Sequence, residues 1–135
     1  MYELTAIDEY QILKSRSGDF LDSAEYQFAK CYFTSAAFSF HQSLELFLKI
    51  RLFICGVEYL RTHSLKSLIE IIANVKEEKC LAASKELLNT YILELALLED
   101  AYITSRYFSR EYSREKIIKL QTVAMEVVKA IGNSC

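Results

Sequence analysis

The sequence FSFHQSLELFLK, residues 38–49, lies in the middle of a long apolar segment that covers residues 31–55. On a helix, spacings of three and four bring side chains onto one face, so Gln42, Glu45 and Lys49 form a narrow polar stripe. Apolar side chains cover nearly all of the remaining circumference, and a helix of this kind is usually buried at the centre of a fold. Buried charges need partners, and Glu45 and Lys49 are spaced to pair with each other.

The composition of the chain favours helices throughout. The 135 residues include no proline and three glycines, so residues that interrupt helices and form tight turns are nearly absent. We therefore predict an all-α fold: an antiparallel, up-and-down bundle of four to five helices, forming a single domain over residues 1–135. A net charge of −2 argues against a surface built entirely for nucleic acid, although it leaves room for a local basic patch.

Helix boundaries follow from the apolar periodicity and from the residues that start and stop helices. The central helix is expected to end at Gly56, and the last helix at Gly132 and Asn133. Either Thr62 or Ser64 can cap the helix that follows the sequence THSL. The expected helical segments are residues 3–30, in which a break at Gly18 stays open, and residues 32–55, 65–75, 82–105 and 113–131, with a charged connection at 76–79.

Four cysteines and two histidines are scattered along the chain without the paired spacing of a zinc site. We therefore expect no metal and no cofactor, and we interpret Cys31, Cys55, Cys80 and Cys135 as buried or incidental thiols. The N-terminus lacks the basic and apolar regions of a signal peptide, and the most apolar stretch, residues 44–54, is too short and too charged to cross a bilayer. These features predict a cytoplasmic protein in a reducing environment, without contact to a membrane.

Four short motifs follow one another in a characteristic order. They are the Q-x-x-E-x-x-x-K stripe of Gln42, Glu45 and Lys49, the helix end at Gly56, the THSL of residues 62–65 and the Y-x-x-S-R-Y of residues 102–107. In this order and spacing they resemble the prokaryotic HEPN domain, of the type associated with nucleotidyltransferases, over residues 21–131. The resemblance implies a helical bundle that often forms homodimers. It also implies partnership with a small nucleotidyltransferase, often within a toxin and antitoxin pair.

The catalytic motif of the HEPN ribonucleases is missing from this chain. Those enzymes carry an Arg followed, after four to six residues, by a His that can move the proton of a ribose hydroxyl. Here no histidine follows His63, and Arg61 precedes it by only two positions. Phe108 also stands where the family often has a proline. The sequence favours a non-catalytic protein, with a divergent ribonuclease as the alternative and a purely structural interaction module as a third interpretation.

The resemblance adds weight to a nucleotide site at one end of the bundle. In this hypothesis Lys49, His63 and Arg106 approach one another and contact phosphate, because cationic side chains suit phosphate oxygens. Nearby tyrosine rings suit a base. The predicted nucleotide-binding residues are therefore Lys49, His63, Arg106, Tyr102 and Tyr107, supported by the polar stripe of Gln42 and Glu45.

His63 has two interpretations. Histidine is the residue type best suited to proton exchange at physiological pH, and His63 lies beside the N-terminus of a predicted helix, where an anion is welcome. It can also be structural, with its ring nitrogens bonding a neighbouring backbone group or Glu45 and so fixing the crossover of the chain; this second interpretation is the favoured one. His41, one residue before the polar stripe, is interpreted as a packing or interface residue.

Basic and aromatic residues gather between residues 102 and 119. Five Lys or Arg face two Glu there, and four aromatic residues are interleaved among them. Such a mixture suits a nucleotide or a single-stranded nucleic acid such as RNA. The alternative, which carries equal weight, is a solvated pair of helix ends whose rings turn into the core.

The apolar content exceeds the need of one small core. Hydrophobic residues make up 52% of the chain and aromatic residues 13%, and a central helix coated on nearly every side leaves surface that must be exposed or covered. A twofold homodimer would cover it most simply. The alternative is a well-filled monomeric core with tyrosines at its rim.

Overall fold

The computed structural model describes residues 5–57, 61–75, 78–107 and 111–135, and for residues 104–107 it describes the backbone alone. The described residues form helices without any strand, which confirms the predicted all-α class. The helices are α1 (Ala6–Ala29), α2 (Phe33–Ile54), α3 (Leu65–Val75), α4 (Glu78–Tyr107) and α5 (Arg114–Ser134).

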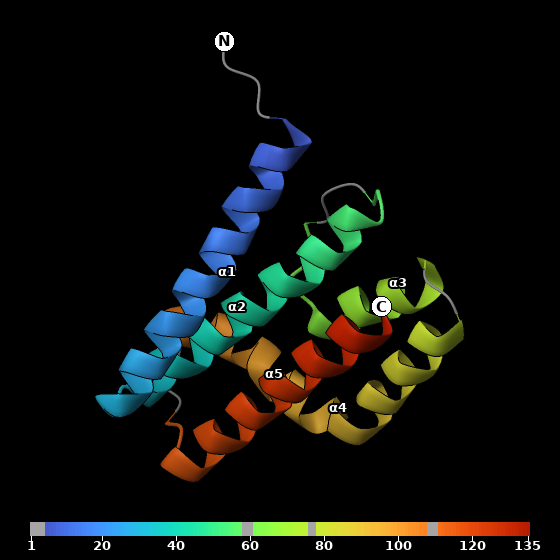
Figure 1. Cartoon of the computed structure of the whole chain (residues 1–135). Helices are drawn as coiled ribbons and strands as arrows, with labels where there is room; N and C mark the ends of the chain where they lie inside the picture. Colours follow the sequence, from blue (N-terminus) through green and yellow to red (C-terminus); the bar gives the residue numbers. More distant parts are fainter. Residues whose placement is uncertain (1–4, 58–60, 76–77, 108–110) are drawn as a thin grey trace.

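Helix α2 is the centre of the bundle, as its nearly uniform apolar surface predicts. It contacts each of the other four helices, whereas α1 packs mainly along α2. Figure 1 shows α1 and α2 side by side and antiparallel, with α5 crossing next to α2 and with α3 beside α4. Two different sides of α2 are therefore covered by different neighbours.

The core is formed by aliphatic side chains from α2, α3, α4 and α5, with few from α1. Leu48, Leu68, Leu98 and Leu120 are among the fully buried side chains. Each buried leucine contributes roughly 1.5–3 kcal/mol through the removal of apolar surface from water. In α1 only Ala24 is buried, so only a narrow stripe of this helix packs against the rest of the bundle.

Local sequence signals explain where α1 begins and where α2 ends. The hydroxyl of Thr5 accepts from the backbone N–H of Asp8, and the carboxylate of Asp8 accepts from the backbone N–H of Thr5, which forms a capping box at the start of α1. Helix α1 then continues through Gly18, so the break left open at this residue is absent. Helix α2 ends just before Gly56, whose φ of +81° is the left-handed conformation that favours glycine after a helix.

Two predicted boundaries in the second half of the chain are wrong. Helix α4 already begins at Glu78, within the charged segment expected to be a connection, and it kinks at Tyr91, where φ is −118° and ψ is 22°. Helix α5 continues past Gly132 to Ser134. A distant residue supports this extension, because Nη2 of Arg51 donates to the carbonyl oxygen of Gly132 at 3.1 Å. Such a contact leaves no trace in the local sequence.

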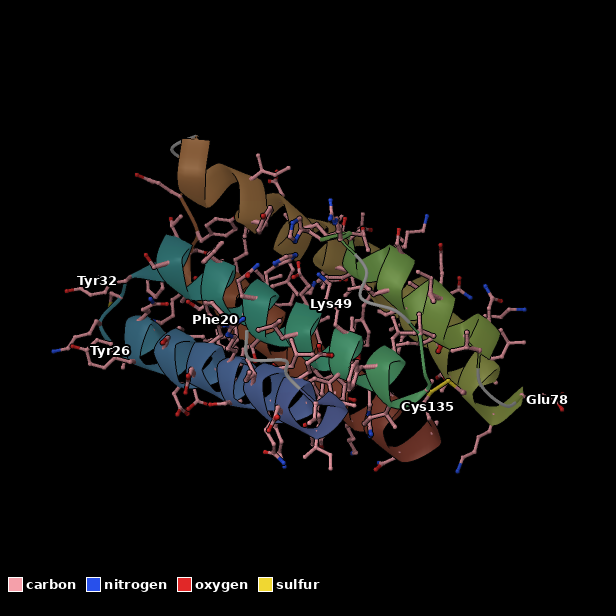
Figure 2. All side chains as sticks on the ribbon, turned by 90° about the horizontal axis from the view of Figure 1, so that it is seen from above. Phe20, Tyr26, Tyr32, Lys49, Glu78 and Cys135 are labelled. Atoms are coloured by element: carbon pink, nitrogen blue, oxygen red, sulfur yellow. A yellow bond between two sulfur atoms is a disulfide. The ribbon has the colours of Figure 1, made fainter. Side chains whose placement is uncertain are left out.

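The interpretation of the cysteines as buried or incidental thiols is wrong for Cys80 and Cys135. Cys80 and Cys135 form a disulfide across a sequence separation of 55 residues, while Cys31 and Cys55 are free. Figure 2 shows this bond tying the C-terminal end of α5 to the beginning of α4. The expectation of a reducing environment rested on unpaired thiols and loses that support.

Within the part of the chain that the structure describes, no helix has the length and hydropathy needed to cross a membrane.

Candidate functional site

A buried carboxylate organises the polar side of α2. Glu45 is 3% exposed and Lys49 is 4% exposed. The Nζ atom of Lys49 lies 3.2 Å from Oε2 of Glu45, and Nδ1 of His63 lies 2.8 Å from Oε1. Figure 2 places Lys49 on the side of α2 that faces away from α1. Each oxygen of the carboxylate therefore has a cationic or N–H partner, which is the condition for burying a charge without a large penalty.

His63 lies in the link before α3 and connects the buried carboxylate to solvent. Its side chain is 47% exposed. Nδ1 carries the proton donated to Glu45, so in the neutral ring Nε2 is the acceptor for the hydroxyl of Tyr102 at 3.2 Å. The bond between His63 and Glu45 that the favoured structural interpretation expects is present.

Three aromatic rings form a ladder that ends at His63. The ring of Tyr102 stacks on Phe38 with centroids 6.1 Å apart, and on His63 with centroids 4.4 Å apart. One face of the imidazole is covered by Tyr102 and both of its nitrogens are bonded, while about half of the side chain is exposed. The ladder thus ends in a ring that is half exposed.

His41 holds the same link through a hydrogen bond to its backbone. It is fully buried, which confirms the packing interpretation. Its Nε2 lies 3.1 Å from the backbone oxygen of His63 and must donate, so Nδ1 accepts the amide proton of Gln42, also at 3.1 Å. Burial lowers the pKa of His41, because the charged imidazolium loses its hydration. A neutral His41 in one tautomer therefore fixes the backbone position of His63.

The N-terminus of α3 is already occupied by a carboxylate of the same chain. Oε1 of Glu99 accepts from the hydroxyl of Ser64 and from the backbone N–H of Lys66, both at 3.0 Å. Ser64 also accepts from the backbone N–H of Ser67, which makes it the cap among the two predicted candidates. A phosphate would therefore compete with Glu99 for this helix end, and the expectation that the amides welcome an external anion loses its ground.

The structure brings together four of the seven predicted site residues directly and a fifth indirectly. Lys49 and His63 share the carboxylate of Glu45, and Tyr102 bonds and stacks on His63. Gln42 joins through His41. Arg106 and Tyr107 belong to α4, but their side chains lie outside the described residues.

The described members of the basic and aromatic cluster have structural partners. The guanidinium of Arg114 lies 5.3 Å from the ring centroids of Phe28 and Phe33, and Lys119 pairs with Glu94 at 3.1 Å. Tyr112 is buried in the core. These contacts match the alternative of rings turned inward, and they leave the His63 region as the best-defined polar site.

Sequence reasoning missed that Glu99 bonds the N-terminus of α3 and that His41 bonds the backbone of His63. Sequence reasoning looks for the cap of α3 among residues next to that helix. The carboxylate that bonds Ser64 comes instead from α4, 35 positions later. His41 carried a signal, because a histidine beside a polar stripe in an apolar helix must find hydrogen-bond partners when buried.

The arrangement can perform two kinds of chemistry. An exposed ring face beside bonded polar groups can stack a base, and an imidazole oriented by a carboxylate can exchange protons through Nε2. Metal chemistry has no visible ligand set, since the described residues include no group of three or more His, Cys, Asp or Glu placed to hold a metal ion.

Comparison with known proteins agrees with the motifs and the bundle. The model of the HEPN domain matches residues 10–134, which is nearly the whole chain. None of the curated proteins compared with the sequence matches it. The match extends from α1 through the last turn of α5, so the chain belongs to the HEPN domain family.

Proposed function

We propose that this HEPN protein binds a nucleotide without transforming it, with the base stacked on the open face of His63. The observation that supports this proposal is the aromatic ladder of Phe38, Tyr102 and His63, whose last ring is half exposed. A base added to the ladder would cover the imidazole and would gain the roughly 1–3 kcal/mol typical of stacking on a protein ring.

The polar groups behind the ladder hold it in place before a ligand arrives. Glu45 fixes one nitrogen of His63 and Tyr102 the other, while His41 holds the backbone of the same residue. A ring that is already ordered loses little entropy on binding, and preorganisation of this kind raises affinity. The role of Lys49 in this proposal is to neutralise Glu45, because both groups are buried.

The phosphate contacts in this proposal come from α4. Arg106 follows Tyr102 by four positions, and residues at this spacing lie on one face of a helix. Arg106 would bind the phosphate and Tyr107 would flank the nucleotide.

We extend the proposal to the partners that the family implies. The working form would be a homodimer, and its partner a minimal nucleotidyltransferase in the cytoplasm, within a toxin and antitoxin pair. Exposed Ile103, which follows Tyr102 directly on α4, supports a protein contact near the ladder. Sedimentation tests the dimer, because a single species of 15.6 kDa at micromolar concentration would refute it.

Calorimetric titration with ATP, AMP, adenosine and ribose 5-phosphate tests base stacking. The three ligands that carry adenine are expected to bind, and ribose 5-phosphate is expected to bind much more weakly because it lacks a base. Bound ATP would also raise the thermal unfolding temperature, since a ligand at a hundredfold excess over its Kd stabilises by about 2.7 kcal/mol. If none of the four binds, the purely structural interpretation replaces the proposal.

His63→Asn is the variant that separates stacking from positioning. The asparagine amide can still donate to Glu45, but it offers no aromatic face. Binding of adenosine is expected to weaken by about fivefold to hundredfold, following the value of one stacked base. Lys66→Gln serves as the control, because its exposed side chain pairs with exposed Glu70 and the substitution keeps the backbone N–H that bonds Glu99. Equal weakening in both variants would contradict the stacking role.

A second candidate function is RNA cleavage without metal. The observation that favours it is the bond from His63 Nδ1 to the buried Glu45, because a carboxylate in this position orients an imidazole as a general base. His63 would then remove the proton of a ribose 2′-hydroxyl, and Arg106 would stabilise the charged phosphate. This would be a divergent ribonuclease, since the usual Arg and His motif of the family is absent from the sequence.

Incubation of single-stranded RNA with the protein in a metal chelator distinguishes the two candidates. The leading proposal expects intact RNA. Cleavage that disappears in both His63→Asn and Arg106→Gln would reverse the order of the candidates. Cleavage that persists in both variants would indicate a contaminating nuclease and would leave the binding titrations to decide.

A further inference from the structure

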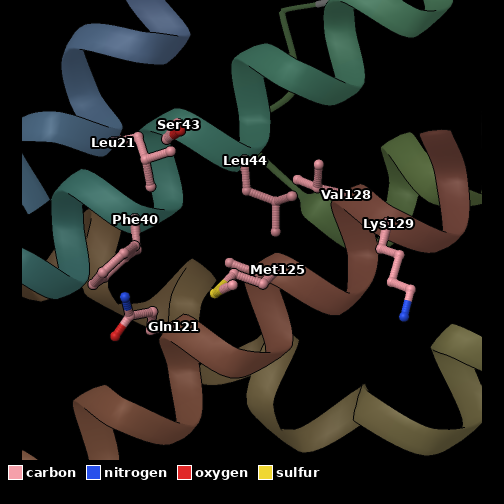
Figure 3. A pocket seen from close by; sticks show the side chains of 9 residues that line it. Leu21, Phe40, Ser43, Leu44, Gln121, Met125, Val128 and Lys129 are labelled. Atoms are coloured by element: carbon pink, nitrogen blue, oxygen red, sulfur yellow. The ribbon is translucent and has the colours of Figure 1, made fainter. Parts of the chain in front are cut away.

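A hollow lies on the opposite side of α2 from the ladder, between α1, α2 and α5. Its volume is about 240 Å³, and its walls include Phe40 and Leu44 from α2 and Met125 and Val128 from α5. Figure 3 shows Phe40 and Leu44 facing Met125 across the hollow, with Leu21 of α1 above. We call this feature the α1–α2–α5 groove.

The groove leaves apolar surface in contact with water. Phe40 and Leu44 form a buried floor, while Leu21, Met125 and Val128 at its rim are exposed, Met125 by 62%. An apolar space of this kind holds water poorly, and exposed apolar area costs roughly 25 cal/mol per Å². Flexible Met125 can adjust to an occupant of varied shape. The groove is therefore suited to an aliphatic group.

Polar groups mark the two ends of the groove. Gln121 and Lys129 are eight positions apart on α5, which corresponds to about 12 Å along a helix. Figure 3 shows them at opposite ends of the lining, with the ammonium of Lys129 turned away from the apolar walls. Within the described chain neither side chain has a hydrogen bond or an ion pair. Lys129 is thus able to swing toward an anion at the mouth of the groove.

From these observations we infer that the α1–α2–α5 groove binds a free medium-chain aliphatic carboxylate. The chain lies between Phe40, Leu44 and Met125, and the carboxylate pairs with Lys129. A volume of about 240 Å³ holds about eight groups of roughly 30 Å³ each, the space of one water molecule in the liquid. The charge of Lys129 selects an anion over an amine, and the length of the groove selects a chain of about eight to ten carbons.

Calorimetric titration of the whole chain with carboxylates of increasing length tests the inference. Butyrate, hexanoate, octanoate and decanoate are used below their micelle concentrations. The affinity is expected to rise about fourfold for each methylene and to level off once the groove is filled. Decyltrimethylammonium, which has the opposite charge, is expected to bind at least tenfold more weakly than decanoate. Equal binding of the two ions, or no binding of decanoate, would overturn the inference.

Two variants locate the binding in the groove. Met125→Glu places a negative charge at the rim and is expected to weaken decanoate binding by about tenfold or more. Lys129→Gln is expected to weaken it by about twofold to fivefold, as for an exposed ion pair, and to leave decanol binding unchanged. Ile118→Glu is the matched control, because it adds the same charge at an exposed apolar position of α5 that does not line the groove.

The remaining outcomes also decide the question. Equal loss in Met125→Glu and Ile118→Glu would show a nonspecific charge effect and would overturn the inference. If Met125→Glu changes the sedimentation of the ligand-free protein, the groove is instead a contact between two copies. Binding to neutral phospholipid vesicles without binding of free decanoate would assign the surface to a lipid bilayer and would equally refute the free carboxylate.

Discussion

The two sides of α2 hold their neighbours by different physical means. On one side, Glu45 is fixed by directional bonds to Lys49 and to His63. On the other side, Phe40 and Leu44 meet α1 and α5 through apolar contact and leave a groove of about 240 Å³. Polar groups tolerate little displacement when buried, whereas apolar surfaces accept an imperfect fit at a modest cost.

Because of this difference, one side of α2 is expected to be rigid and the other side adaptable. The polar side presents an ordered ring that is ready for a flat ligand, and the apolar side presents a hollow whose rim can move. A change on the polar side should therefore be costly unless its partner changes as well. A change on the apolar side should depend on how far the surroundings can collapse.

Glu45→Ala tests the polar side and is expected to have the largest effect. It leaves the ammonium of Lys49 buried without its carboxylate and removes the partner of His63 Nδ1. Removal of one member of a buried ion pair typically costs about 3–5 kcal/mol. Urea unfolding followed by circular dichroism measures this loss.

The double variant Glu45→Met with Lys49→Met is the informative comparison for that experiment. Replacement of both charges by apolar groups of similar volume often leaves stability unchanged or improves it. Recovery of most of the lost free energy would assign the cost of Glu45→Ala to the stranded charge. Glu70→Ala, which breaks an exposed pair with Lys66, is expected to cost less than about 1 kcal/mol.

The sequence predicted the main contacts on the polar side of α2 but not the contacts made by the neighbouring helices. The spacing of Glu45 and Lys49 predicted their pairing, and the need of a buried carboxylate for partners made a bond to His63 one of two open interpretations. The bond of Glu99 to Ser64 could not be predicted, because it joins residues from two helices whose packing is not encoded in local spacing. Helix periodicity is a local signal. It therefore predicted the five helical segments, and it could not predict the contacts between them.

The apolar side was predictable only as a buried surface. Phe40 and Leu44 are spaced to face a neighbour, but hydrophobic contact is non-directional, so the sequence does not specify where packing stays incomplete. The disulfide of Cys80 and Cys135 escaped prediction for a related reason. Its two ends lie together because α4 and α5 pack against each other, and no pattern of cysteine spacing indicates it.

A pair of leucine substitutions tests the apolar side. Leu48 is fully buried away from the groove lining, whereas Leu44 borders the groove. Leu48→Ala is expected to cost about 3–4 kcal/mol because it opens a new cavity, and Leu44→Ala about 2 kcal/mol because its space merges with an existing hollow that is open to solvent. Urea unfolding with equal m-values would measure the difference, and a larger cost for Leu44→Ala would show that the groove is tightly filled in solution.

The pH dependence of stability tests the buried histidine on the polar side. Burial holds the pKa of His41 below its ordinary value of 6.5. Both states carry a neutral imidazole well above pH 6.5, but below it the unfolded chain takes up a proton that the folded chain resists, so the free energy of unfolding falls as the pH falls. The loss between pH 7 and pH 5.5 is expected to be at most about 1 kcal/mol, the limit for one histidine that stays neutral in the folded state. His41→Gln should flatten this part of the profile, because the amide can still donate to the His63 carbonyl but does not titrate; an unchanged slope would contradict the assignment.

Tyr102 gives the smallest expected change and the finest test of the ladder. Tyr102→Phe removes the hydroxyl bonded to His63 Nε2 but keeps the ring, so it should cost at most about 1 kcal/mol of stability and leave adenosine affinity within about twofold. Tyr102→Leu removes the ring that supports His63 and should weaken adenosine binding by at least about fivefold, since the imidazole loses its stacked support. If Tyr102→Phe weakens binding as strongly as Tyr102→Leu, the hydrogen bond rather than the ring orders His63. The polar side of α2 would then act through hydrogen bonds alone, and the open face of the imidazole would be incidental to its function.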